Sequence, residues 1–268
     1  MKKTLILLLC IVNAAISLAQ ADSIPACPKT DTEIKTLSVL WQQDAAEYRA
    51  LCYQAFNIAL LRVNQLPKTE FKKYKLAIIT DLDETILDNS YSTAQTIKDG
   101  GEFSGKTFNA WVKLAAATAV PGAVDFLQAA HKKGISIFYI SNRDTSQLDS
   151  TLLNLQKLKL PDANFAHMLF RSKPSSSKEE RRNEVEKKYK IVLLMGDNLG
   201  DFMKTFETTD ISKRFFETDI VKEEWGKKFI VLPNSTYGDW EKALYSRDGL
   251  TTQQKAQERL QLLKGIKK

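Results

Sequence analysis

Apolar positions along the chain follow two patterns that alternate. Four short runs are almost continuously apolar, as in strands buried on both faces of a sheet: "LAIIT" (76–80), "ISIFYIS" (135–141), "IVLLMG" (191–196) and the weaker "KFIVLP" (228–233). Segments between them, such as "PGAVDFLQAAHKK" and "SQLDSTLLNLQKLK", repeat apolar residues every three or four positions, which indicates amphipathic helices. This alternation predicts an α/β fold, with a mostly parallel sheet flanked by helices.

Two segments depart from the alternation. Residues 32–66 keep helical spacing without Gly or Pro until Pro67, which predicts a long amphipathic helix or a helix pair. Residues 87–119 interrupt the pattern directly after the first strand. We interpret this second segment as an insertion that covers a site.

The first 21 residues have the pattern of a secretory signal peptide. "MKK" supplies positive charge, "TLILLLCIV" an apolar centre and "LAQA" small residues for cleavage near Ala21, which leaves 22–268 as the mature domain. The apolar run is shorter than the roughly 20 residues of a membrane-spanning helix. We therefore expect an exported protein without a membrane span, periplasmic or secreted. Lipid attachment at Cys10 is disfavoured, because leucines precede it where a lipoprotein signal has small residues.

Charge and cysteine content add weaker constraints. The chain has 39 basic and 32 acidic residues, and this modest excess favours anionic small molecules, with no nucleic-acid motif beside it. Cys27 and Cys52 remain after cleavage, and export would permit a disulfide between them, which the sequence leaves undecided. A homodimer is equally undecided.

Carboxylates and amides gather where three of the predicted strands end. The first strand runs into Asp81 and Asp83, the second into Ser141-Asn142, and the third into a segment with Asp197 and Asp201. Any one of these could be an ordinary turn or helix cap, but three in succession favour a site at one edge of the sheet. Converging carboxylates repel each other unless a cation binds, and oxygen ligands with water suit Mg²⁺. A calcium loop of the EF-hand type is excluded, because Ile86 stands where such a loop needs Gly.

The spacing of Asp81 and Asp83 suits phosphoryl transfer. Asp81 can attack phosphorus to form an aspartyl-phosphate, while Asp83 protonates the leaving oxygen and then activates water. Ser141, the Asn142 backbone and a lysine of "SSSKEERR" would supply donors to the phosphate oxygens.

These motifs resemble the haloacid dehalogenase (HAD) superfamily, and within it the bacterial class C acid phosphatases. The first signature is "DLDETILDNSY" and the second is "VLLMGDNLGDF". Similarity continues through "WQQDAAEYRALCYQAF", "AVPGAVDFLQAA", "IFYISNR", "SKEERR" and "VLPNSTYGDWE", so it covers nearly all of the chain from about Trp41 onward. It implies a Rossmann-like core and a smaller, mainly helical cap.

The resemblance also implies a role for each candidate residue. Asp81 would be the nucleophile and a metal ligand, and Asp83 the general acid and base, which binds the metal through its backbone carbonyl. Asp197 would complete the metal ligands, and Asp201 would hold metal-bound water or orient its neighbours. The phosphate would be bound by Ser141, Asn142 and Lys178, with Lys173 as a competitor for the lysine role. The rest of "KEERR" has the composition of a solvated helix face.

Aromatic residues of the insertion and of the last strand region match the family's substrate clamp. The matching positions are Trp111 and Tyr237, with Phe108 as a weaker candidate. Stacking tolerates many rings, so we expect loose specificity for nucleotide or aryl leaving groups. An aromatic residue at helical spacing is otherwise most often part of a core.

Four other polar residues are expected to have no catalytic role. Glu84 and Asp88 should bond locally, and His131 and His167 lack the Arg-rich motif of phosphohistidine enzymes. The basic C-terminal helix, "LTTQQKAQERLQLLKGIKK", is expected to pack on the core.

The leading hypothesis is an exported, Mg²⁺-dependent acid phosphatase acting on phosphomonoesters such as nucleoside monophosphates and aryl phosphates. Two alternatives are a non-catalytic anion-binding envelope protein and a phosphotransferase that uses an acceptor alcohol in place of water.

Overall fold

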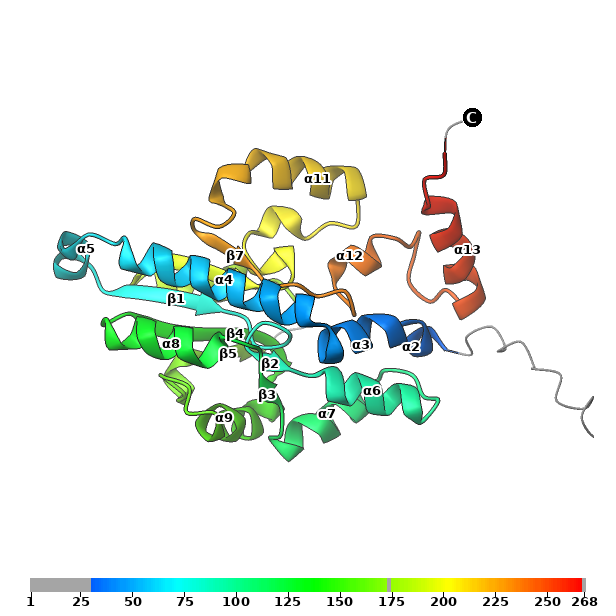
Figure 1. The fold of residues 1–268 in the computed structure, drawn as a ribbon, viewed down its shortest axis with the longest axis horizontal. Coiled ribbons are helices and arrows are strands. Elements are labelled where there is room, and N and C mark those ends of the chain that lie inside the picture. The colour runs from blue at the N-terminus through cyan, green and yellow to red at the C-terminus, as the bar shows by residue number, and fades with distance from the viewer. Residues whose placement is uncertain (1–29, 173–174, 267–268) are drawn as a thin grey trace, which may run out of the picture.

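The computed structural model describes residues 30–172 and 175–266. A five-stranded sheet lies at its centre, with strand order β5-β4-β1-β6-β7 and parallel pairing throughout (Figure 1). The strands are β1 (Leu76–Thr80), β4 (Ser136–Asp144), β5 (Met168–Arg171), β6 (Lys190–Gly196) and β7 (Phe229–Val231). The predicted parallel α/β sheet is confirmed. Strand β5 was not predicted, because four residues at a sheet edge are too few to form a recognisable apolar run.

Each face of the sheet packs on its own hydrophobic cluster. On one face, Ile78 of β1 packs with Phe56 of α4 (Ala46–Asn64) and Phe126 of α8 (Ala123–Lys132). On the other face, Ile79 packs with Val185 of α10 (Glu179–Glu186). All five residues of β1 are buried, which explains why its sequence is continuously apolar.

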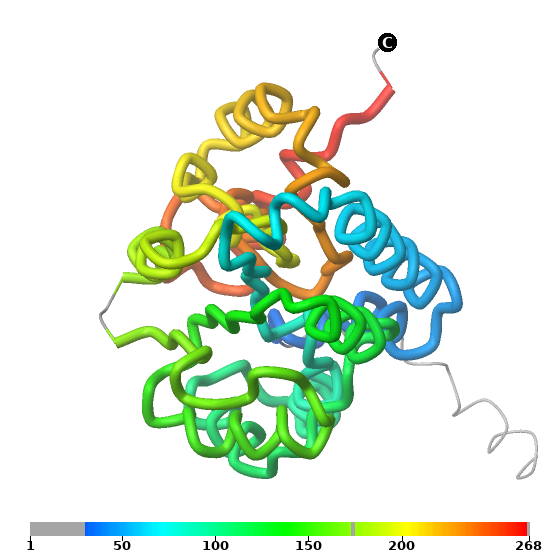
Figure 2. The backbone as a smooth tube through the Cα atoms, turned by 90° about the vertical axis from the view of Figure 1, so that its left-hand side faces the viewer, coloured from blue at the N-terminus to red at the C-terminus, as the bar shows by residue number. Residues whose placement is uncertain are grey.

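The segment 32–66 forms three helices rather than one or two. They are α2 (Asp31–Ile34), α3 (Thr36–Asp44) and α4, and the extended backbone of Ala45 separates the last two. Helices α2 and α3 contact the inserted segment through α6. The N-terminal helices therefore join the core to the insertion (Figure 2).

The inserted segment is a small, mainly helical cap, as predicted. Strands β2 (Leu87–Asp88) and β3 (Thr118–Ala119) pair in antiparallel fashion at its base. Helices α6 (Ser90–Lys98) and α7 (Gly105–Leu114) lie between them. Because β2 follows the end of β1 by only a few residues, the cap starts directly beside the predicted site (Figure 1).

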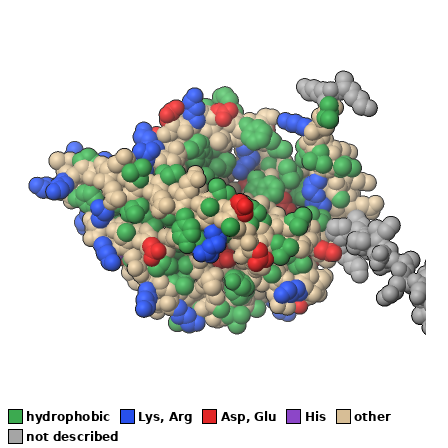
Figure 3. All heavy atoms as spheres, viewed as in Figure 1, with side chains coloured by type: hydrophobic (Ala, Val, Ile, Leu, Met, Phe, Trp, Pro, Cys, Tyr) green, Lys and Arg blue, Asp and Glu red, His purple; other side chains and the backbone are tan. Residues whose placement is uncertain are grey.

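The remaining helices are α5 (Lys68–Lys73), α9 (Leu148–Lys157), α11 (Ile211–Ile220), α12 (Asp239–Lys242) and α13 (Thr252–Leu262). Helix α13 buries no residue and is attached by polar contacts, such as the 2.5 Å ion pair of Lys255 with Asp31, so its expected packing on the core is wrong. Among the described residues, no helix combines the length and apolar character that a membrane crossing needs. On the face in Figure 3, basic side chains are scattered rather than gathered.

Several expectations concern residues outside the described ranges. The predicted signal peptide, Cys10, Cys27 and Lys173 all lie there. Cys52 is fully buried in α4, and its pairing with Cys27, which the sequence leaves undecided, involves a residue outside the described ranges.

Candidate active site

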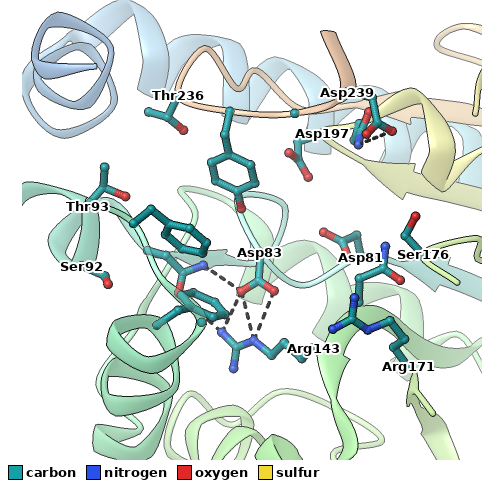
Figure 4. A pocket seen from close by; sticks show the side chains of 18 of the residues that line it. Asp81, Asp83, Ser92, Thr93, Arg143, Arg171, Ser176, Asp197, Thr236 and Asp239 are labelled. Atoms are coloured by element: carbon teal, nitrogen blue, oxygen red, sulfur yellow. Dashed lines mark hydrogen bonds and ion pairs between the residues drawn. The ribbon is translucent and has the colours of Figure 1, made fainter. Parts of the chain in front are cut away.

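The three predicted strand ends meet at one edge of the sheet. Strand β1 lies between β4 and β6, so the residues that follow these strands are neighbours. A cavity of about 760 Å³ opens at this edge, between the sheet and the cap (Figure 4). Seven of the predicted site residues line it: Asp81, Asp83, Asn142, Lys178, Asp197, Asp201 and Tyr237.

Three carboxylates and one lysine form what we call the core-side cluster: Asp81, Asp197, Asp201 and Lys178. Carboxylate oxygens of the three aspartates lie within 4.8 Å of one another. The buried Lys178 Nζ contacts Asp81 Oδ1 and lies 2.6 Å from Asp201 Oδ1. No described residue donates a hydrogen bond to Asp81 Oδ2. One oxygen of Asp81 is thus held by Lys178, and the other is left for a ligand.

The electrostatics of the core-side cluster favour a bound cation. Burial raises the pKa of Asp81 well above its usual value, and the charges of Asp201 and Asp197 add to this rise against the opposing effect of Lys178. Burial and Asp201 likewise raise the pKa of Asp197 to about 7. Lys178 can neutralise only one of three carboxylates. The donor set therefore fits a hard divalent cation with oxygen ligands.

Asp83 belongs to a second group, the cap-side cluster, formed by Asp83, Asn89, Arg143, Phe108 and Trp111. The Arg143 guanidinium donates to Asp83 from Nε at 3.1 Å and from Nη2 at 2.7 Å. Asn89 Nδ2 donates to the same carboxylate at 2.8 Å. The arginine side chain is 2% exposed, so this is a buried, bidentate ion pair. Sequence reasoning missed Arg143, although it stands in the "ISNR" motif.

The two phosphate-binding candidates on β4 differ in position. Asn142 lines the cavity, and its Oδ1 accepts a 2.6 Å hydrogen bond from Arg181. Ser141 is fully buried, and its hydroxyl donates to Asp83 Oδ2 at 3.4 Å. Arg181 also donates to the Ser141 carbonyl at 2.6 Å. The structure thus places Asn142 at the cavity surface and Ser141 behind Asp83.

The "KEERR" segment is only partly the solvated face that its composition indicates. Arg182 is buried and donates to the carbonyls of Gly200 and Asp201, both at 2.9 Å. Together with Arg181, it connects α10 to the C-terminal end of β4 and to the turn that follows β6. These two arginines are a further pair that sequence reasoning missed. Their only signal was an excess of basic residues beside the site lysine.

Gly196, the last residue of β6, makes room for Asp201. A Cβ atom at this position would lie 2.3 Å from Asp201 Oδ2 and 2.4 Å from Asp201 Cβ. Asp201 Oδ2 also accepts a 3.1 Å hydrogen bond from the Asn198 backbone. Only glycine therefore allows this placement of the Asp201 carboxylate.

The aromatic candidates lie in different places. Tyr237 lines the cavity, and its hydroxyl donates to Glu84 Oε2. Trp111 is not among the lining residues: it packs against the hydrophobic core, and its Nε1 donates to Asn89 Oδ1 at 2.8 Å. Phe108, the weaker candidate, does line the cavity, with Arg143 5.6 Å from its ring centroid.

Glu84 and Asp88 make the expected local bonds and also distant ones. Glu84 Oε1 accepts from the Asn89 backbone at 2.9 Å, and Asp88 Oδ1 accepts from the Ser90 backbone at 2.9 Å. Burial beside Asp83 raises the pKa of Glu84 to about 8. Beyond these, Glu84 binds Tyr237 and Asp88 accepts from Gln42 at 2.8 Å. Both carboxyls therefore attach the loop after β1 to other parts of the fold.

Neither histidine lines the cavity. His131 Nδ1 lies 3.3 Å from Asp162 Oδ2. His167 stacks on Phe138 with ring centroids 4.4 Å apart, and its Nδ1 is 2.8 Å from the Ile137 carbonyl. These contacts agree with structural roles.

Comparison with known proteins identifies the relatives of this fold and site. Residues 13–240 match the family model of HAD superfamily, subfamily IIIB (acid phosphatase). The class C acid phosphatase from Bacillus anthracis is 38% identical, with a TM-score of 0.82, over 88% of this chain and 99% of that chain. A second structure of that enzyme, with tungstate bound, matches with the same values.

Proposed function

Because this chain belongs to the acid phosphatases of subfamily IIIB of the HAD superfamily, we propose that it is an exported, Mg²⁺-dependent class C enzyme that hydrolyses phosphomonoesters through an aspartyl-phosphate. Its family makes it a phosphomonoesterase. The observation that carries the finer proposal is Asp81, a buried carboxylate with one oxygen on Lys178 and no described donor on the other.

The proposed reaction has two displacements at phosphorus. Asp81 attacks the phosphorus atom, the ester P–O bond breaks, and Asp83 gives a proton to the leaving alcohol oxygen. Water then attacks the phosphorus of the aspartyl-phosphate and Asp83 takes a proton from that water. The bond between phosphorus and the Asp81 oxygen breaks, so inorganic phosphate leaves and the Asp81 carboxylate is restored. An acidic optimum follows from this scheme, because the first displacement needs a protonated Asp83.

The residues around Asp81 support this chemistry. Lys178, the Asn142 side chain and the Asn142 backbone would bind the phosphoryl oxygens, with Ser141 behind them. Asp81, the Asp83 carbonyl and Asp197 would hold Mg²⁺, which would supply positive charge to offset the developing charge on phosphate. Asp201 holds Lys178 in position at 2.6 Å. Tungstate, which binds the related enzyme, is a tetrahedral oxyanion like phosphate.

The remaining parts of the proposal concern substrate and location. A cavity of about 760 Å³ has room for a nucleotide, and Tyr237 and Phe108 offer aromatic surface for nucleoside or aryl groups. For Trp111, a place beside the substrate stays a prediction. Segment 87–119 would act as the cap of a domain spanning 22–268. Export with cleavage near Ala21, and assembly as a homodimer, are further expectations.

One experiment tests the proposal directly. Purified mature protein is assayed with p-nitrophenyl phosphate and a nucleoside monophosphate at several pH values, with Mg²⁺ and after exhaustive EDTA treatment. We expect turnover that is greatest at acidic pH and that is lost in EDTA and in Asp81→Asn. Full activity after EDTA treatment, or tight nucleotide binding without turnover, would contradict the proposal.

A further inference from the structure

The cavity contains one basic side chain that has no ionic partner. Five basic residues line it, and four of them pair with a carboxylate: Lys35, Arg143, Lys178 and Lys242. The fifth is Arg171. Within 30–172 and 175–266, no residue makes a hydrogen bond or an ion pair with its side chain. The guanidinium of Arg171 is therefore not held by an ion pair or a hydrogen bond with any described residue.

Arg171 has its backbone two strands away from that of the proposed nucleophile. It is the last residue of β5, which is separated from β1 by β4. Two inter-strand spacings place its backbone about 10 Å from β1 across the sheet. In Figure 4 its side chain extends into the cavity from the same side as Asp81 and Ser176, while Thr236 and Asp239 lie on the opposite side.

The carboxylate beside Arg171 in the sheet is Asp144, its register partner on β4. Hydrogen bonds from Ser146, and after them the charge of Arg171, lower the pKa of Asp144, but the side chains of Arg171 and Asp144 form no ion pair. Asp144 Oδ1 instead accepts a 2.9 Å hydrogen bond from the Ser146 backbone, where it caps a short helical turn. The guanidinium is thus half-buried and keeps its fork of N–H donors for a ligand.

We propose that Arg171 forms a subsite for a second anionic group, a carboxylate or a phosphate, carried by the leaving alcohol of the substrate. A guanidinium binds either group with two parallel hydrogen bonds. In the proposed function, the transferring phosphate binds at Asp81 and Lys178. Arg171, on a strand two positions away in the sheet, would therefore bind a group on the leaving alcohol. The inference rests on the proposed function at Asp81 and adds a preference for doubly anionic phosphomonoesters.

A matched pair of substrates tests the subsite. 3-Phosphoglycerate and glycerol 3-phosphate carry the same phosphoester, but only the first has a carboxylate on its leaving alcohol. We expect Arg171→Gln to lower kcat/KM for 3-phosphoglycerate about ten- to hundredfold, the usual effect of losing hydrogen bonds between charged groups. For glycerol 3-phosphate the loss should be less than about threefold, and Arg171→Lys should recover part of the difference.

Lys242→Gln is the matched control, because Lys242 also lines the cavity but is paired with Asp239 at 2.9 Å. It removes the same charge, so it should change the ratio of the two kcat/KM values by less than about twofold if direct contact is what matters. Inhibition by inorganic phosphate should keep the same constant in Arg171→Gln, since that phosphate would occupy the position beside Asp81.

Three results would overturn the inference. They are an equal loss with both substrates in Arg171→Gln, a weaker inhibition by inorganic phosphate in that variant, or the same change of ratio in Lys242→Gln. A wild-type enzyme that turns over glycerol 3-phosphate and p-nitrophenyl phosphate but not 3-phosphoglycerate would also overturn it. That last outcome would leave the proposed function intact, whereas failure with all three esters would reject both.

Discussion

Asp81 and Asp83 are two residues apart, but they belong to different electrostatic regions of the cavity. Asp81 lies in the core-side cluster, where three carboxylates share Lys178. Asp83 lies in the cap-side cluster, where Arg143 gives it a cation of its own, 2.7 Å away. The first region has an excess of negative charge, and the second is balanced. Residue type alone therefore does not decide what a carboxylate in this site can do.

The difference follows from how each region is built. Asp81 and Asp197 directly follow β1 and β6. Asp201 ends the short helical turn after β6, and Lys178 is the residue before α10. Asp83 is connected through Asn89 to Trp111 of the cap, with hydrogen bonds of 2.8 Å at both steps. We infer that Asp81, on the core side, attacks phosphorus. Asp83, on the cap side, transfers the proton, and its position depends on that of the cap.

The largest effect should come from removing the core-side cation. Lys178→Ala leaves three carboxylates, two of them buried, without the counter-charge of Lys178, and it removes a proposed donor to the phosphate. We expect kcat/KM for p-nitrophenyl phosphate to fall about a thousandfold, as when a donor to the transition state is lost. Lys187→Ala on the same helix is the control, because its ion pair with Glu184 is exposed. A fall of less than about tenfold would mean that the core side does not depend on this lysine.

Removing the cap-side cation should instead change how activity depends on the leaving group. Arg143→Met removes the hydrogen bonds that orient the Asp83 carboxylate. Proton transfer from Asp83 to the leaving oxygen should therefore become slower. For a nucleoside monophosphate, kcat/KM should fall about a hundredfold, within the usual range for general acid catalysis. p-Nitrophenyl phosphate should lose about tenfold or less, because nitrophenolate leaves without a proton. Equal losses of kcat/KM with both esters would contradict a separate role for the cap-side cluster in proton transfer.

The position of Asp201 can be tested through Gly196. In Gly196→Ala the new Cβ must displace Asp201, since it would lie 2.3 Å from Oδ2. We expect the Mg²⁺ concentration for half-maximal activity to rise about tenfold to a hundredfold, as for other residues that orient metal ligands. The Mg²⁺ dependence of turnover measures this. Gly200→Ala is the control, because its Cβ would meet no atom closer than 3.5 Å; the same shift in both variants would contradict the account.

The smallest effect is expected at the link between Asn89 and the cap. Trp111→Phe keeps an aromatic ring but loses the hydrogen bond to Asn89, which stabilises by about 1 kcal/mol. We expect kcat/KM for a nucleoside monophosphate to fall about fivefold, in proportion to that energy. Trp225→Phe removes a similar bond, from Nε1 to the Thr218 carbonyl at 3.1 Å, far from the cavity. Trp225→Phe should lower the melting temperature without changing kcat/KM. An equal loss of kcat/KM in both variants would show that the hydrogen bond between Trp111 and Asn89 has no specific effect on catalysis.

Sequence alone predicts the core-side cluster well. A continuous apolar run followed by Asp81, and a second run followed by Asp197, indicate two buried parallel strands whose ends must meet. The strands β1, β4, β6 and β7 are confirmed for the same reason, since burial on both faces leaves a clear pattern. Lys178 could be selected only through the resemblance, because composition does not separate it from the other lysines of its segment.

The cap-side cluster could not be predicted in this way. The cap-side partners of Arg143, Asn89 and Asp83, are 54 and 60 positions away in the sequence, and nothing in the local pattern shows which carboxylate it meets. Arg182 looks like part of a solvated helix face but is buried against the loop after β6. Trp111 has helical spacing that suits either a core or a substrate-binding position. In each case tertiary packing decides the role, and a basic or aromatic residue type is compatible with several outcomes.

The central claim is that Asp81 is the group that attacks phosphorus. The most direct test is to mix Asp83→Asn with p-nitrophenyl phosphate and Mg²⁺, quench in acid, and locate any phosphoryl group by mass spectrometry. Because this variant should form the aspartyl-phosphate but hydrolyse it slowly, the account predicts one phosphoryl group on the peptide that contains Asp81. A phosphoryl group on another residue, or release of nitrophenol in the first turnover with no labelled peptide, would contradict it.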